Sequence, residues 1–179
     1  HPYHSMAEAS ANAARAGDVK PADIVAIEVS SPYMKHLHGP RHPTDLIGIA
    51  HSPAYFLAAG AADRSFGWAH ASEAKINDPV IRGLLDKVQV VAQPTQDLER
   101  FKQGCIVTLR TRDGRAHSAT VYAPRGAAVL GIRWEDVEEK YRALTPAAGL
   151  APQNIEASRT CIRNLRQLKH AGELTQLLR

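Results

Sequence analysis

The chain has 179 residues, of which 44% are hydrophobic and 22% charged, with 22 basic and 18 acidic side chains and a net charge of +4. This profile is typical of a soluble globular chain with one domain of ordinary size and a short appendage, and it excludes disorder. The basic residues are scattered rather than gathered with aromatic side chains, and no apolar run approaches the roughly 18 residues that span a bilayer, so we expect neither a nucleic-acid nor a membrane partner.

Helices and strands are expected in the order helix, strand, helix, helix, strand, hairpin, helix, helix. The assignments rest on alanine-rich and 3.6-residue apolar periods for helices, and on β-branched runs for strands. The pairs Ser52-Pro53 and Asp78-Pro79 are typical helix starts, and Asp113-Gly114 is a typical hairpin turn. In chain order the predicted elements are a helix at 5–16, a strand at 24–29, helices at 52–62 and 80–86, strands at 88–91, 105–110 and 116–122, and helices at 134–144 and 155–168.

The hairpin favours an α+β fold, with an antiparallel or mixed sheet and helices packed on one face. We expect an α+β domain over residues 1–145 and a helical tail over residues 146–179. The tail helix carries an apolar stripe of Ile155, Ile162, Leu165 and Leu168. Such a stripe tends to be covered, so this tail is expected to pack on another domain or on a partner chain.

Residue types that carry chemistry do not form a familiar catalytic or metal-binding motif. No GxGxxG, P-loop, GxSxG or HExxH is present. The loop from Ser31 to Asp45 holds His36, His38 and His42, but their spacing matches no zinc pattern, and we expect no metal. Two distant cysteines without a CxxC unit indicate a reduced cytoplasmic protein.

Six short segments, taken in order, resemble the C-terminal domain of the MmgE/PrpD family. They are His4-Ser5-Met6-Ala7-Glu8-Ala9, Pro21 to Val29, Ser52 to Ala58, Asp78-Pro79-Val80-Ile81-Arg82-Gly83-Leu84 with Lys87 to Val90, Val107 to Gly114 with Pro124-Arg125-Gly126, and Glu139 to Leu144. The chain begins at His1 and runs directly into a helical pattern, as expected of a chain that starts inside a larger protein.

The resemblance implies a function. Members of that family include 2-methylcitrate dehydratase, cis-aconitate decarboxylase and iminodisuccinate epimerase, which act on small di- and tricarboxylates without a metal or organic cofactor. The active site lies between a large helical domain and an α+β lid, and this chain would supply the lid. The resemblance therefore implies a carboxylic-acid lyase or isomerase that needs an N-terminal helical domain and is inactive as this chain alone. We expect a homodimer because self-association would cover the apolar stripe of the tail.

The same resemblance implies site residues. His4 matches the histidine of the H-x-x-[hydrophobic]-[DE]-A motif and would be the catalytic acid–base group, with His1 as a competitor that fits the spacing less well. Tyr55, Ser52 and Arg125 would contact the substrate, Arg125 through paired hydrogen bonds to a carboxylate. The alternative reading is a non-catalytic binding or oligomerisation module that retains the lid fold, or an unrelated structural domain.

Overall fold

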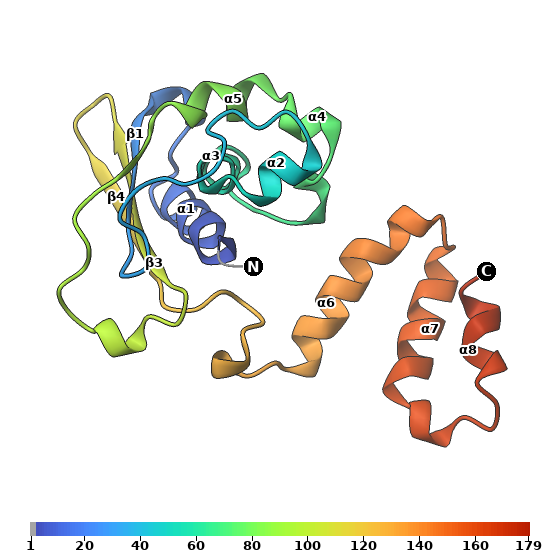
Figure 1. The fold of residues 1–179 in the computed structure, drawn as a ribbon. Helices are drawn as coiled ribbons and strands as arrows, with labels where there is room; N and C mark the ends of the chain where they lie inside the picture. Colours follow the sequence, from blue (N-terminus) through green and yellow to red (C-terminus); the bar gives the residue numbers. More distant parts are fainter. Residues whose placement is uncertain (1–2) are drawn as a thin grey trace. The chain divides into compact units, whose positions relative to one another are not determined.

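The computed structural model of the chain describes residues 3–179, whose contacts divide into one unit that ends at Val129 and a second unit at Leu130–Arg179 (Figure 1). The elements are α1 (His4–Ala16), β1 (Ile24–Ser30), α2 (Leu46–Ala50), α3 (Pro53–Asp63), α4 (Glu73–Ile76), α5 (Pro79–Leu85), β2 (Val88–Val90), β3 (Cys105–Thr111), β4 (Ala116–Val121), α6 (Trp134–Leu144), α7 (Pro152–Arg163) and α8 (Gly172–Leu177). Every helix and strand expected from the sequence is present, which confirms the α+β class.

The first unit contains a four-stranded mixed sheet in the order β2-β1-β3-β4. The β3–β4 hairpin turns at Asp113 and Gly114, where Gly114 has φ +82° and the Asp113 carboxylate accepts the Arg115 N–H at 3.1 Å. A turn this short can join only antiparallel strands, whereas β1 and β2 are parallel and are connected by the longer crossover through α2 to α5. The predicted hairpin and the predicted mixed sheet are both confirmed.

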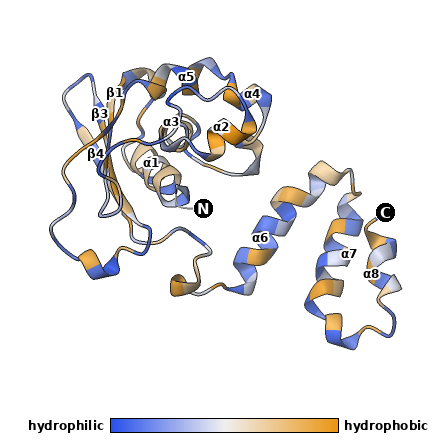
Figure 2. Cartoon of the chain, viewed as in Figure 1, coloured by the Kyte–Doolittle hydropathy of each residue, from blue (hydrophilic) through white to orange (hydrophobic). Residues whose placement is uncertain are grey.

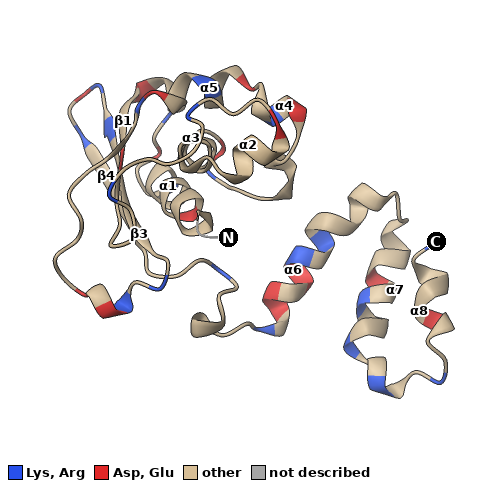
Figure 3. Ribbon diagram, in the orientation of Figure 1, with Lys and Arg blue, Asp and Glu red and all other residues tan. Residues whose placement is uncertain are grey.

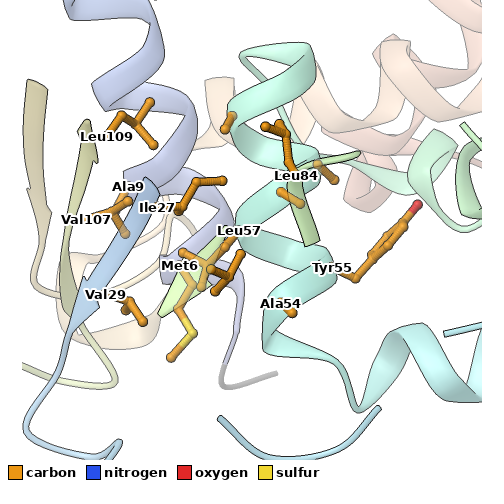
Figure 4. Close-up of a cluster of buried hydrophobic side chains, with 14 of the residues drawn as sticks. Met6, Ala9, Ile27, Val29, Ala54, Tyr55, Leu57, Leu84, Val107 and Leu109 are labelled. Atoms are coloured by element: carbon orange, nitrogen blue, oxygen red, sulfur yellow. The ribbon is translucent and has the colours of Figure 1, made fainter. Parts of the chain in front are cut away.

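One face of this sheet is apolar and covered by helices. Ile27, Val29, Val107 and Leu109 alternate toward that face and are fully buried, and the side chains of α1 and α3 pack onto them (Figure 4). The intervening residues face the other way and are polar, as in the 2.6 Å Glu28–Arg110 ion pair. The period of two along each strand thus separates a core face from a polar face.

Helices α1 and α3 lie unusually close to each other. Ser10 Oγ donates a 2.7 Å hydrogen bond to the buried carbonyl of Leu57, and Gly60 lies against the backbone of Ala7. A Cβ atom at Gly60 would be only 2.3 Å from the Ala7 carbonyl oxygen. A glycine is therefore required at this crossing because any side chain would push the two helices apart.

Helix starts agree with the capping residues read from the sequence. Ser52 Oγ accepts the Tyr55 N–H, and the Asp78 carboxylate accepts the Val80 N–H at 2.9 Å. The short helices α2, α4 and α8 were not predicted, since four to six residues are too few to show a helical period. Helices α2 and α4 nevertheless have N-caps of the usual type, Asp45 and Ser72.

The second unit consists of α6, α7 and α8. A charge cluster links α6 to α7: the Glu138 carboxylate accepts hydrogen bonds from Arg159 at 2.7 Å and from Arg163 at 2.8 Å, and Glu156 accepts one from Arg142 at 2.7 Å. Figure 3 shows these acidic and basic residues along α6 and α7. Within this unit, α6 and α7 are also joined by a 2.7 Å hydrogen bond between the Tyr141 and Ser158 hydroxyls.

The tail helix was predicted to reach residue 168, but α7 ends at Arg163. At its C-cap, the Asn164 side chain donates to the Thr160 carbonyl at 3.1 Å, and a single 3₁₀ turn follows over residues 165–167. Of the predicted apolar stripe, Ile155 is buried, whereas Leu165 remains 53% exposed. The stripe therefore spans two elements rather than one helix.

Candidate functional site

His4 is the first residue of α1 and is exposed. Its imidazole stacks on the ring of Phe56 from α3, with the ring centroids 5.8 Å apart and the planes 30° apart. An exposed imidazole at the start of a helix, supported on one side by a buried aromatic ring, is accessible to a ligand and restricted in orientation. The competitor His1 lies outside the described residues.

Glu8 brings a distant loop to the same end of α1. The Arg125 backbone N–H donates a 2.9 Å hydrogen bond to the Glu8 carboxylate, although 117 residues separate them. Glu8 follows His4 by four residues, so both side chains lie on one face of α1. The loop of Pro124, Arg125 and Gly126 is thereby held near His4, with Arg125 exposed and Gly126 at φ +85°.

Tyr55 and Ser52 lie in the interior. Ser52 Oγ accepts the Tyr55 N–H at 3.1 Å, and the Tyr55 hydroxyl donates to the His70 carbonyl at 2.8 Å. Figure 4 shows the Tyr55 ring on the side of α3 away from Ile27 and Val29. Burial raises the pKa of Tyr55 to about 12, so the hydroxyl stays protonated and serves as a donor.

A charged cluster that the sequence did not indicate lies beside Tyr55. His70 is 5% exposed, and its Nδ1 accepts the Gly67 N–H at 3.1 Å. The ring proton consequently sits on Nε2, which donates to the Asp63 carboxylate at 3.0 Å. Lys75 also binds Asp63, at 2.5 Å, and this interaction raises the pKa of Lys75. The spacing of Asp63, His70 and Lys75 in the sequence matches no known motif, so the sequence did not predict this cluster.

A surface hollow lies elsewhere in the same unit. It has a volume of about 310 Å³ and is lined by residues of the loop before β3 and by Ile106, Thr120 and Tyr122. Ile106 and Thr120 alternate with the buried Val107 and Val121, so the hollow opens on the polar face of the sheet. It contains none of the predicted site residues.

The histidines of the loop from Ser31 to Asp45 contact each other and the C-terminal end of α5. The rings of His36 and His38 meet edge to face with their centroids 4.6 Å apart, and His42 Nε2 lies 2.8 Å from the Asp86 carboxylate. Within residues 3–179, no three His, Cys, Asp or Glu side chains are grouped to hold a metal ion. In the same part of the chain, no helix is long and apolar enough to cross a membrane.

The structure thus places two of the four predicted site residues at the N-terminal half of α1. His4 begins this helix, and the Arg125 N–H bonds to Glu8 one helical turn later. Ser52 and Tyr55 point into the protein and are bonded there. The sequence did indicate that Glu8 lies on the same helix face as His4, because the two residues are four positions apart in a predicted helix.

Comparison with known proteins provides one finding about the family. The family model described as the MmgE/PrpD C-terminal domain matches residues 1–165, which include the whole sheet and the helices α1 to α7. No curated protein matches the chain.

Proposed function

We propose a function from the family to which this chain belongs: it is a member of the MmgE/PrpD family and carries that family's C-terminal domain over residues 1–165. The chain is the lid part of a cofactor-independent lyase or isomerase that acts on small di- or tricarboxylic acids. One observation supports the proposal beyond family membership: the Arg125 N–H bonds to Glu8, one helical turn after the exposed His4 on α1.

The chemistry requires a group that moves a proton and a cation that holds a carboxylate. In the proposed step, the His4 imidazole takes a proton from the carbon next to a carboxylate, and the electron pair of that C–H bond passes into the carboxylate. Arg125 binds the carboxylate and offsets the charge that develops on its oxygens. In a dehydration, this electron pair then forms the C=C bond while the neighbouring C–O bond breaks, and the hydroxyl group takes a proton from the imidazolium and leaves as water. In an epimerisation, the imidazolium returns the proton to the carbon. A histidine side chain suits both directions near neutral pH.

Ser52 and Tyr55 remain proposed substrate contacts, to be tested in the complete enzyme. Both have protein partners in this structure, so a substrate contact requires the hydroxyl of Tyr55 to exchange its bond to the His70 carbonyl. Tyr55→Phe is expected to change turnover or apparent affinity severalfold if that exchange occurs. Unchanged kinetics in this variant would remove the pair from the site.

The partners proposed are the N-terminal helical domain of the same enzyme and a second copy of the chain. Large apolar side chains remain exposed in the second unit: Trp134 at 37%, Val137 at 42%, Leu165 at 53% and Leu178 at 44%. Figure 2 shows hydrophobic residues recurring along α6, α7 and α8. Contiguous exposed apolar surface is commonly covered by another chain, and homodimers are the commonest outcome. Sedimentation of the chain at high concentration should show a dimer, and a strict monomer would contradict this part.

The proposal is tested in the enzyme assembled with its helical domain. His4→Gln should lower turnover of 2-methylcitrate or cis-aconitate by a factor on the order of 10² or more, the effect of removing a positioned acid–base group. Arg125→Ala should raise the apparent KM, and Arg125→Lys should restore only part of it because lysine lacks the bidentate geometry. His170→Gln, at an exposed position of the second unit, is the matched control and should leave turnover unchanged.

Two results would refute the proposal. Turnover within twofold of the parent in His4→Gln would exclude the proton-transfer role and favour a non-catalytic module. Robust turnover by the 179-residue chain alone would exclude the need for a second domain, since that chain should show only background activity.

A further inference from the structure

The close crossing of α1 and α3 determines what lies beneath His4. The Gly60–Ala7 contact and the Ser10–Leu57 hydrogen bond lock the register of the two helices. With this register, Phe56 of α3 lies under the first turn of α1. Phe56 is 6% exposed, and its ring meets His4 in a stacked arrangement and Tyr3 edge to face, with centroids 5.8 and 5.7 Å away.

The stack continues away from the surface as a row of four rings. Phe56 stacks on Phe66 with centroids 4.6 Å apart and planes 29° apart, and Phe66 stacks on His70 at 4.7 Å and 21°. All three centroid separations lie in the range in which aromatic pairs attract. The row of His4, Phe56, Phe66 and His70 therefore connects the exposed histidine to a buried one.

The buried end of the row is held in place by hydrogen bonds on three sides. His70 Nε2 donates to Asp63, its Nδ1 accepts the Gly67 N–H, and its carbonyl accepts the Tyr55 hydroxyl. Asp63 in turn binds Lys75 at 2.5 Å. The His70 ring cannot rotate without breaking its bonds to Asp63 and Gly67, so it presents a fixed face on which Phe66 stacks.

We propose that Phe56 is the positioning residue of His4, itself held in orientation through Phe66 by the His70–Asp63 pair. The inference rests on the catalytic role proposed for His4. Stacking on a ring restricts the staggered rotamers that an imidazole adopts, and a proton transfer tolerates little misplacement of the imidazole. Phe56 selects one orientation by offering its face to the imidazole on one side.

The first test uses NMR spectroscopy of the full 179-residue chain, with the imidazole signals of His4 assigned by their loss in His4→Gln. Stacking on a phenyl face shifts the imidazole proton signals upfield and slows their rotamer exchange. Phe56→Leu should move these signals toward those of a free histidine and increase their mobility. Phe101→Leu removes another buried phenylalanine of the same unit and should leave them unchanged.

A second variant provides a test in case Phe56→Leu fails to fold. Phe66 is only partly buried, so Phe66→Leu disturbs the core less and should shift the His4 signals in the same direction by a smaller amount. Unchanged His4 signals in both Phe56→Leu and Phe66→Leu, in a folded chain, would overturn the inference. Equal shifts in Phe101→Leu would also overturn it, because the effect would then be a general loosening.

The second test measures kinetics in the complete enzyme. Phe56→Leu should lower kcat on the order of tenfold while KM changes less than about twofold, because the substrate still binds but the imidazole is misaligned. A change in KM alone would contradict a positioning role. The two experiments distinguish failure of the proposed function from failure of this inference. An active His4→Gln enzyme would refute the catalytic role of His4. Unaltered His4 NMR signals in Phe56→Leu would refute only the positioning role of Phe56.

Discussion

Replacement of Gly60 by alanine tests the tight crossing of α1 and α3 on which the site geometry depends. The new Cβ would lie 2.3 Å from the Ala7 carbonyl oxygen and 3.1 Å from two further Ala7 backbone atoms. An ordinary carbon–oxygen contact is about 3.3 Å. The helices must therefore separate by roughly 1 Å, because a backbone atom cannot swing aside as a side chain can.

The expected loss follows from two opposing effects. Overpacking of a close-packed interior costs about 1–3 kcal/mol, whereas alanine in place of glycine in a helix contributes up to about 1 kcal/mol. We expect Gly60→Ala to lower the free energy of unfolding by about 1–2 kcal/mol. With a denaturant slope of about 2 kcal/mol per molar, the urea midpoint would fall by about 0.5–1 M.

Gly83→Ala is the matched control for this substitution. Gly83 is an exposed residue of α5, and a Cβ atom there would meet nothing within 4 Å. This variant should gain about 0.5–1 kcal/mol from helix propensity alone. Urea unfolding would be followed by circular dichroism, and backbone NMR signals of α1 and α3 would assign the transition to the first unit.

Two outcomes would refute the reasoning. If Gly60→Ala were as stable as the parent, the two helices would not be in contact at this glycine. If both variants lost equal stability, the contact with Ala7 would not be the cause. A smaller upfield shift of His4 in Gly60→Ala would link the crossing to the site, because a wider spacing lifts His4 from Phe56.

Three further predictions concern titratable and buried groups. Burial raises the pKa of the Cys105 thiol to about 12. At pH 8 a thiol reagent should therefore label only Cys161 in the folded chain and both cysteines in urea. Rapid labelling of both thiols without urea would contradict this. Tyr55→Phe leaves the buried His70 carbonyl without its donor and should lower the free energy of unfolding by about 1–3 kcal/mol, and an unchanged urea midpoint would count against it. Hydrogen bonds first from Arg142 and then from Arg159 lower the pKa of Glu156 from 4.5 to about 2, so the stabilisation of the α6–α7 pair is complete above pH 4.5 and is lost as the pH falls toward 2. NMR signals of α6 and α7 should show this acid-induced loss in the parent and a smaller loss in Glu156→Gln, where Glu138 still pairs with Arg159 and Arg163.

Local patterns in the sequence predicted the elements because their causes are local. Ser52 and Asp78 accept backbone N–H groups a few residues away, and Gly114 takes a left-handed conformation within its own turn. The end of the tail helix was wrong because a hydrogen bond between Asn164 and Thr160 stops α7 where the apolar period continues.

The sequence by itself determined the α+β class, the order of the long elements and the family. It also placed His4 at the start of a helix, since apolar periods, caps and motifs all lie within short stretches of chain. Only the tertiary structure decided what surrounds that histidine. The Glu8–Arg125 hydrogen bond joins residues 117 positions apart, and the row from His4 through Phe56 to His70 depends on how closely α1 crosses α3. The physical reason is that packing distances between helices are set by contacts such as Gly60 against Ala7, which no local pattern contains.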